Sequence, residues 1–224
     1  MSQLPKDRPE EVIERVRNGE GDEAELAGVD LSGRDLAKLK LRKATLTGAN
    51  LSRCNMKGVS LSRAKLSEAD LSSGVLYDAT LTKAVLTGAN LTGVKATASA
   101  LDDANLAGSV CVDLEVERTN CIGSAFTHAD LSRARFTGST LNLASFDDAI
   151  LSHASFSECA VHGASFSGAN LAHARFTKSE LYRADLSTAN LDGATFEAVK
   201  YDRETKWPAD AAPEGTLFVE APDL

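Results

Sequence analysis

The chain has 224 residues, and its 24 basic and 32 acidic side chains give a formal net charge of −8. This excess of acid argues against general binding to nucleic acids, which requires a basic surface. The first residues are charged and no apolar run approaches about 18 residues, so the sequence predicts neither a signal peptide nor a membrane span, and a cytoplasmic protein is expected.

The first predicted element is a short helix in residues 1–25, from Asp7 to about Asn18. Asp7 is followed three residues later by Glu10, which is the spacing of a capping box. Three apolar residues fall on one face of this helix: Val12, Ile13 and Val16. We expect that face to cover the open end of the structure that follows, because the first coil of a solenoid exposes both core and unpaired backbone.

A ladder of apolar residues occupies every fifth position from Leu26 to Tyr201, without one insertion. Only Ala96 is undersized among these 36 positions, and a second, small residue stands two places before most of them. Neither a strand, with its period of two, nor a helix, with its period of 3.6, can bury such a ladder on one side. The chain must therefore turn a corner in every five residues and wind around a core.

Two longer periods indicate the number of sides. From Phe126 to Leu181 the ladder alternates Phe with Leu or Val, a period of ten that suits an even number of sides. Asp or Asn precedes the ladder residue at seven of nine positions spaced by twenty: Asp30, Asn50, Asp70, Asn90, Asp130, Asn170 and Asn190. The sequence therefore predicts a four-sided coil of twenty residues, repeated about nine times.

The segments Ala-Asn-Leu-Thr-Gly (89–93), Ala-Asp-Leu-Ser-Arg (129–133) and Ala-Asn-Leu-Asp-Gly (189–193) resemble the pentapeptide-repeat family, whose pattern is A(D/N)LXX. The resemblance covers residues 26–201. It implies an all-β fold, a right-handed quadrilateral parallel β-helix, with the ladder and small residues inside and the other three of each five outside. It specifies the fold far more than the function, since one fold serves unrelated roles.

The pattern weakens between Ala96 and Cys121, where we expect a bulge or a narrowed coil in unbroken register. This region carries five acidic residues with only Arg118 opposing them: Asp102, Asp103, Asp113, Glu115 and Glu117. They are interpreted either as a solvated charged face or as an acidic patch that binds a partner.

Charge divides the ladder into two halves. Residues 26–100 carry 11 basic and 5 acidic groups, whereas residues 101–200 carry 7 basic and 13 acidic groups. Lys43, Arg63 and Lys83 are spaced by twenty and should form a basic stripe, which either faces an anionic partner or is tolerated by solvent.

Residues 202–224 follow the ladder and contain the only Trp of the chain. The candidate residues at this end are Trp207, Leu217, Phe218 and Val219. They are expected to cover the last coil, or to form a two-fold dimer contact. The resemblance favours the dimer, since pentapeptide-repeat proteins often dimerise at this end.

No motif carries chemistry, so we expect neither an enzyme nor a cofactor or metal site. Cys54, Cys111, Cys121 and Cys159 show no metal-binding spacing and are interpreted as buried thiols. His153 and His173 should be neighbours on the surface, and a two-histidine metal site lacks a third ligand. The Asp and Asn side chains should hydrogen-bond the local backbone and one another.

Two functional hypotheses remain. The first is a scaffold or regulator that binds another protein through the outer faces of the β-helix, which the uninterrupted register favours. The alternative, implied by resemblance to the quinolone-resistance branch of the family, is a DNA-mimicking partner of DNA gyrase or another type II topoisomerase that confers resistance to topoisomerase poisons. The acidic second half favours the alternative, and the basic first half opposes it.

Overall fold

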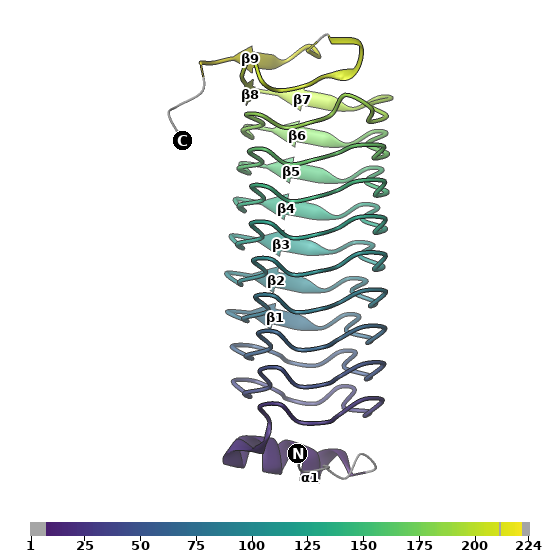
Figure 1. The fold of residues 1–224 in the computed structure, drawn as a ribbon, viewed down its shortest axis with the longest axis vertical. Helices are drawn as coiled ribbons and strands as arrows, with labels where there is room; N and C mark the ends of the chain where they lie inside the picture. The colour runs from purple at the N-terminus through teal and green to yellow at the C-terminus, as the bar shows by residue number, and fades with distance from the viewer. Residues whose placement is uncertain (1–7, 211, 221–224) are drawn as a thin grey trace.

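The computed structural model describes residues 8–210 and 212–220 of the chain. The chain forms a rod in which coils stack along one axis, with a helix under the first coil and a short strand pair over the last (Figure 1). The architecture is the predicted right-handed quadrilateral parallel β-helix. Its core runs the length of the rod and consists of the ladder residues together with the small residues two places before them.

The N-terminal helix α1 spans Pro9–Arg15 and continues as a π-helical turn over Val16–Glu20. Its apolar face is buried in the same core as the first coil, as predicted: Val12, Ile13 and Val16. The N-cap is Arg8, which makes no capping hydrogen bond through its side chain. The predicted cap Asp7 lies outside the described residues.

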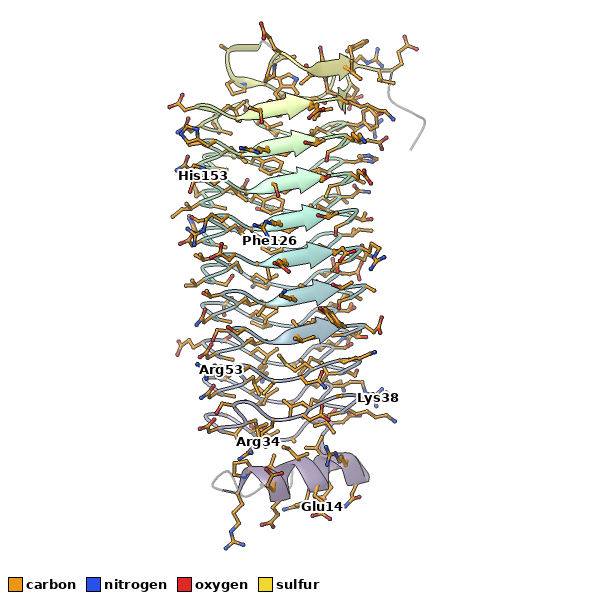
Figure 2. The ribbon with its side chains drawn as sticks, turned by 180° about the vertical axis from the view of Figure 1, so that it is seen from behind. Glu14, Arg34, Lys38, Arg53, Phe126 and His153 are labelled. Carbon is orange, nitrogen blue, oxygen red and sulfur yellow. The ribbon has the colours of Figure 1, made fainter. Side chains whose placement is uncertain are left out.

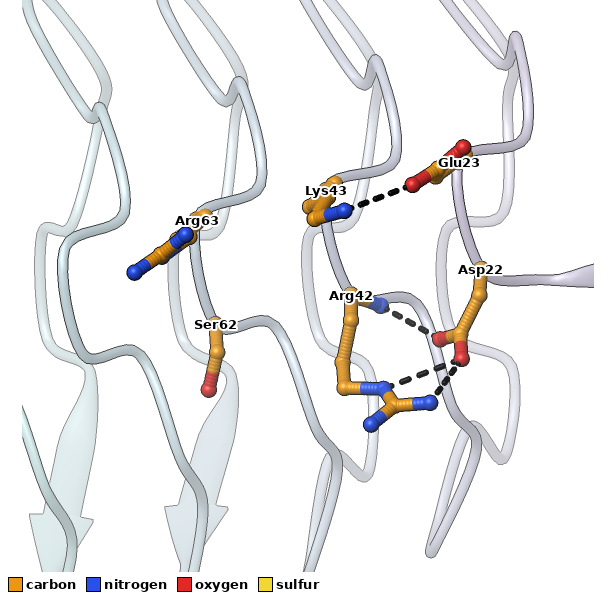
Figure 3. Close-up of a pocket in the computed structure, with 6 residues that line it drawn as sticks. All are labelled: Asp22, Glu23, Arg42, Lys43, Ser62 and Arg63. Carbon is orange, nitrogen blue, oxygen red and sulfur yellow. Dashed lines mark hydrogen bonds and ion pairs between the residues drawn. The ribbon is translucent and has the colours of Figure 1, made fainter.

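Successive coils pair in parallel with a register of twenty residues. The main sheet contains seven strands in chain order: β1 (Val75–Tyr77), β2 (Lys95–Thr97), β3 (Glu115–Glu117), β4 (Arg135–Thr137), β5 (Ser155–Ser157), β6 (Arg175–Thr177) and β7 (Thr195–Glu197). Isolated bridges continue the same register toward the N-terminus, beginning with Glu25 opposite Thr45. Outward side chains twenty residues apart therefore lie on neighbouring coils (Figure 3).

The sequence predicts about nine coils, whereas the continuous sheet has seven strands. The difference arises in the first coils, where neighbouring coils meet at single bridged residues, such as Asn55 opposite Val75, and not along three-residue strands. The sequence-based count of nine includes those coils, because it counts ladder residues and not paired strands.

Aromatic rings fill the core of the second half. Phe126, Phe146 and Phe166 stack twenty residues apart, with ring centroids 5.1 and 4.9 Å apart. A second stack on the opposite side contains Phe136, Phe156, Phe176 and Phe196, and rings of the two stacks meet edge to face at 6.0–6.2 Å. The period of ten thus places Phe on two opposite sides of each coil. Figure 2 shows Phe126 inside the rod and His153 at its edge.

The corner side chains act as predicted. The Oδ1 atom of Asp30 accepts a hydrogen bond from the backbone N–H of Ser32 at 3.0 Å, and Asn90 accepts one from Thr92 at 3.1 Å. The same bond recurs at Asn50, Asp70, Asp130, Asn170 and Asn190. These side chains satisfy a backbone donor in each turn, as Asx turns do.

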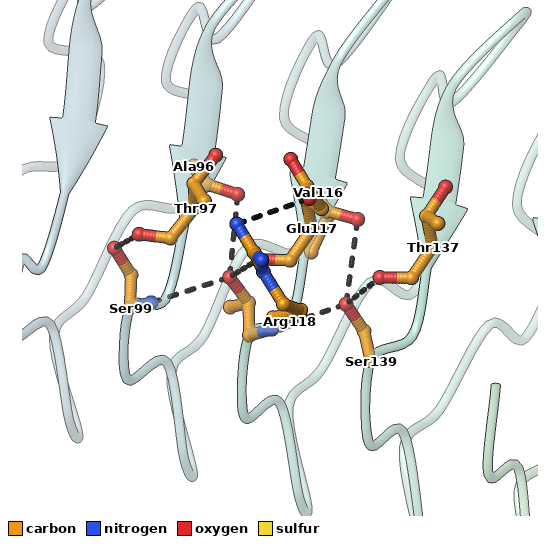
Figure 4. Close-up of polar contacts among 9 residues, drawn as sticks. Ala96, Thr97, Ser99, Val116, Glu117, Arg118, Thr137 and Ser139 are labelled. Carbon is orange, nitrogen blue, oxygen red and sulfur yellow. Dashed lines mark hydrogen bonds and ion pairs between the residues drawn. The ribbon is translucent and has the colours of Figure 1, made fainter. Parts of the chain in front are cut away.

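The bulge predicted between Ala96 and Cys121 is absent. Ala96 pairs with Val116, and Val116 pairs with Phe136, with no residue inserted. Buried hydroxyls hold this region together: Ser99, Thr119 and Ser139, which we call the hydroxyl ladder (Figure 4). The Thr119 Oγ1 accepts from the N–H of Ser99 at 3.3 Å and donates to the carbonyl of Ala96 at 3.2 Å or that of Glu117 at 3.0 Å. Hydrogen bonds therefore compensate for small ladder residues here.

The rod ends in a short closing segment. Strand β8 (Val199–Tyr201) pairs in parallel with β9 (Thr216–Phe218), and a 3₁₀ turn over Pro208–Asp210 lies between them in the chain. Within the described residues, no helix is long and apolar enough to cross a membrane.

Candidate interaction surface

The acidic residues of the candidate patch are mostly paired with cations on neighbouring coils. Asp113 accepts two hydrogen bonds from Arg133, each 2.8 Å long. Glu115 lies between Lys95 at 3.4 Å and Arg135 at 3.6 Å. Asp103 pairs with Lys83 at 3.7 Å, and Glu117 with its chain neighbour Arg118 at 3.1 Å. In the described part of the chain, Asp102 forms no ion pair.

These pairs change the electrostatics of the patch. The Arg133 guanidinium, through its hydrogen bonds, holds the pKa of Asp113 below its usual range. The structure does not bring the five acidic residues into one patch. Asp113, Glu115 and Glu117 lie on one side of the rod, whereas Asp102 and Asp103, half a coil earlier, lie on the opposite side. Most of the five are matched with a positive charge, so each of these surfaces is a mixed one. Exposed pairs of this kind contribute little to stability.

The predicted basic stripe occupies corners of three successive coils. Lys43 pairs with Glu23 at 2.7 Å, and Lys83 pairs with Asp103. Arg63 makes no ion pair among the described residues and lines a hollow of about 330 Å³ together with Lys43 and the Arg42–Asp22 pair (Figure 3). The stripe is therefore an alternation of paired and free cations.

At the C-terminal end, Trp207 is buried, and its ring packs edge to face against Phe196 at 5.5 Å and Tyr201 at 5.7 Å. The backbone N–H of Val219 donates to the carbonyl of Tyr201 at 2.8 Å. Leu217 and Phe218 remain 51% and 59% exposed. Trp207 thus closes the core, whereas the two residues of β9 leave an apolar surface at the tip of the rod.

The four cysteines are free and buried, as predicted. Burial raises the pKa of Cys111 to about 12 and that of Cys159 to about 11, so these thiols stay protonated at neutral pH and serve as small apolar residues. His153 and His173 stack with ring centroids 5.0 Å apart. The described residues contain no group of three or more His, Cys, Asp or Glu side chains placed to hold a metal ion.

Sequence reasoning missed the exposed apolar residues of the second half. Val110 and Ile150 are the two exceptions in the Asp/Asn column, and both are exposed. That break in the column was the signal that could have identified them.

Two further apolar residues, Ile122 and Leu143, lie on neighbouring coils. Ile122 is level with the position before Leu143, because the register between coils is twenty residues. We call this pair the apolar corner. Leu143 is 68% exposed and has a φ of +59°. Among the described residues with positive φ it is the only large apolar side chain, because the others are Gly, Ala or polar. Gly123 and Gly163 occupy the equivalent corners on either side, so no side chain flanks Leu143 in its own column. Its Cδ2 atom lies over Gly163, where an added Cβ would come within 3.0 Å of it.

The family models match most of the ladder. The model described as "Pentapeptide repeats (8 copies)" matches residues 24–63 and 60–95, and the model described as "Pentapeptide repeat region" matches residues 112–187 and 129–205. A comparison with curated protein sequences finds no match.

Solved structures of similar fold include HetL, a pentapeptide repeat protein involved in heterocyst differentiation regulation in the cyanobacterium Nostoc. It is 25% identical, with a TM-score of 0.48 over 89% of this chain and 97% of HetL. QnrB1, a plasmid-mediated fluoroquinolone resistance protein, is 16% identical, with a TM-score of 0.48 over 85% of this chain and 89% of its own. A pentapeptide repeat protein of the Arabidopsis thaliana thylakoid lumen is 28% identical, with a TM-score of 0.36 over 51% of this chain and 66% of its own.

Proposed function

Because the chain belongs to the pentapeptide-repeat family, we propose that it is a protein-interaction scaffold that binds a partner through the outer faces of its β-helix. The observation that carries this proposal is the apolar corner. A strained, exposed Leu costs stability, because left-handed backbone is unfavourable for a residue with a Cβ by about 1–2 kcal/mol. A gain in binding would account for its presence, since an exposed Leu that enters a pocket of a partner is removed from water and can anchor an interface.

The surrounding surface supports a protein as the partner. Ion pairs between coils neutralise much of the charge in the second half, as at Asp113 and Arg133. A partner can therefore make apolar contacts with this surface without bringing its own charges near a large excess of one sign. The core is packed with side chains throughout, and the hollows on the outside of the described rod are shallow and lined mainly by charged and polar side chains. Binding, and not catalysis, fits such a surface. We place this role in the cytoplasm.

The test is affinity capture from cells of the source organism, followed by mass spectrometry. The bait is the wild-type protein or the variant Leu143→Gly, which removes the side chain and suits the backbone conformation. We expect one or a few proteins to be retained by the wild type and lost with the variant. A matched variant, Lys43→Gly, makes the same change at a corner of the first half and should keep them. Identical capture by wild type and Leu143→Gly would contradict the proposal.

A second candidate is a type II topoisomerase as the partner. The observation that favours it is the excess of acidic groups in residues 101–200, 13 against 7 basic ones. The test is a gyrase supercoiling assay with a fluoroquinolone, comparing the wild type with a variant in which Asp102, Asp103, Asp113, Glu115 and Glu117 are neutralised. Protection by the wild type that the variant loses would support this partner, and no effect of the wild type would exclude it.

Dimerisation belongs to the same proposal. The exposed Leu217 and Phe218 form an apolar tip that a second copy could cover across a two-fold axis. Light scattering of the wild type and of Leu217→Ser/Phe218→Ser would test it. A dimer that the double variant converts to a monomer is expected, and a wild-type monomer at micromolar concentration would contradict it.

A further inference from the structure

A cluster of cations stands on the otherwise acidic second half of the rod. It lines a hollow of about 610 Å³ beside the first residues of β4, β5 and β6. Two of its lining residues are Asp113 and Ser155. The other five carry guanidinium or imidazole groups: Arg133, Arg135, Arg175, His153 and His173. We call this site the arginine–histidine hollow.

The coil geometry brings these residues together from two columns. Arg133, His153 and His173 occupy one corner column, and Arg135, Ser155 and Arg175 occupy the next outward column, with an inward Ala between the columns on each coil. Arg135 and Arg175 are two coils apart, about 10 Å between backbones. Ser155 between them is small, so the middle coil forms the floor of the hollow.

The positive charge of the hollow is only partly compensated. Asp113 holds Arg133 through two hydrogen bonds. Glu115 is shared between Arg135 and Lys95, so one carboxylate faces two cations. Arg175 forms no ion pair with any described residue.

On the C-terminal side the hollow is bordered by a small residue. The equivalent corner position there is Gly193, over which the His173 ring lies: a Cβ at Gly193 would come within 2.5 Å of the His173 Nδ1 atom. A bulkier residue would displace this ring. The hollow therefore has a defined wall of two stacked imidazoles.

We propose that the arginine–histidine hollow binds a phosphate dianion. Guanidinium groups from both sides and imidazole N–H groups from the wall provide donors in more than one direction, which suits a tetrahedral oxyanion with several acceptor oxygens. The Ser155 hydroxyl adds a donor from the floor. A nucleic acid backbone fits less well, because the cations are confined to three coils and Glu115, Glu117 and Glu197 flank them.

The proposal goes beyond the scaffold function and does not depend on it. The hollow and the apolar corner belong to different columns of the coil, so anion binding can be measured whether or not a protein partner exists. The phosphate could be free or carried by a phosphorylated polypeptide, and the experiment distinguishes these sources.

The test is an NMR titration of the full chain at constant pH and ionic strength, which follows the imidazole C–H signals of the four histidines. The probes are inorganic phosphate, a short phosphoserine peptide and its unphosphorylated form. We expect saturable shifts at His153 and His173 but not at His128 and His162. A lower saturating concentration for the phosphoserine peptide would identify a phosphorylated chain as the source, and equal or lower values for inorganic phosphate would identify the free anion.

Variants make the assignment specific. Arg175→Gln should weaken binding of the better probe by about tenfold or more, because a charge-assisted hydrogen bond is lost. The matched variant Arg63→Gln removes another unpaired, exposed arginine from the first half and should change binding by no more than about twofold. Equal effects of the two variants, the absence of saturable shifts, or tighter binding of a single-stranded oligonucleotide would overturn the proposal. Circular dichroism on both variants checks that the fold is retained.

Discussion

Residues 26–100 and 101–200 share one backbone coil but solve its packing differently. The first half is filled by Leu, and its coils meet largely at isolated bridges. The second half is filled by two stacks of Phe and carries most of the continuous sheet. The repeat therefore sets the path of the chain, whereas the size of the inward side chains decides how the core is packed.

The outer surfaces differ in the same way. In the first half the corners with positive φ are Gly or polar, apart from Ala98, and Asx turns repeat without interruption through Asn90. In the second half that regularity fails at Val110, Leu143 and Ile150, all exposed. Departures from the repeat that do not help the fold indicate where function resides.

The largest effect is expected from emptying the aromatic core. Phe146 is fully buried and contacts four other Phe rings, so Phe146→Ala should lower the free energy of unfolding by about 3–5 kcal/mol. Leu66 lies in the same inward column of the first half. Leu66→Ala should lower the free energy of unfolding by about 2–5 kcal/mol, and no ring stacking is lost in this variant. Urea denaturation measures both. A smaller loss for Phe146→Ala than for Leu66→Ala would show that the aromatic stacks are not the stronger core.

The hydroxyl ladder should give the next largest effect. It begins at Ser99, at the end of the first half, and continues into the second, whereas the earlier positions of the same column are apolar: Leu39, Val59 and Ala79. Thr119→Val keeps the shape but leaves the Ser99 N–H without its acceptor. The free energy of unfolding should fall by about 1–3 kcal/mol. Thr119→Ser retains the hydroxyl and serves as the control. Equal losses for the two variants would show that packing, and not hydrogen bonding, stabilises this region.

Relief of strain at the apolar corner should give a small effect of opposite sign. Leu143→Gly should raise the free energy of unfolding by about 0.5 kcal/mol, since the release of left-handed strain exceeds the entropy lost by Gly. Leu143→Ala removes the same side chain but keeps the Cβ, so it should bring no gain. A thermal melt distinguishes them, and stabilisation by both variants would contradict the role of backbone strain.

The smallest effect is expected from the ion pairs on the surface. One such pair is Asp113–Arg133 in the second half, and its counterpart near the N-terminal end of the rod is Glu23–Lys43. Hydrogen bonds from the cation lower the folded-state pKa of both carboxylates. A depressed pKa contributes stability above the unfolded-state value, and that stability is lost as the pH falls through the folded-state value. Near neutral pH, Asp113→Asn and Glu23→Gln should therefore have a slightly lower free energy of unfolding than the wild type. In acid, the free energies of unfolding of the variants and the wild type should converge. A wild-type advantage that persists below both pKa values would contradict this account of the pairs.

Much of the fold could be predicted because a period of five admits few solutions, and the Phe alternation and Asx column selected four sides. The hydroxyl ladder could not be predicted, since Thr119 occupies a position where the pattern requires only a small residue. The contribution of its hydroxyl depends on backbone atoms of the neighbouring coil. The sequence shows that the five acidic residues share one stretch of the chain, but half a coil separates Asp103 from Asp113. Their pairing with Arg133, Lys95 and Lys83 requires side-chain reach across coils. The division into segments 1–25, 26–201 and 202–224 stays a prediction.

The central claim is that a protein partner contacts the apolar corner of the second half. The most direct measurement is photo-crosslinking in living cells with a photoreactive amino acid in place of Ile122, compared with one in place of Arg63 in the first half. The account predicts a discrete crosslinked species of higher mass at position 122, lost when Leu143→Gly is added, and none at position 63. The same crosslinks at both positions, or none at position 122, would contradict it.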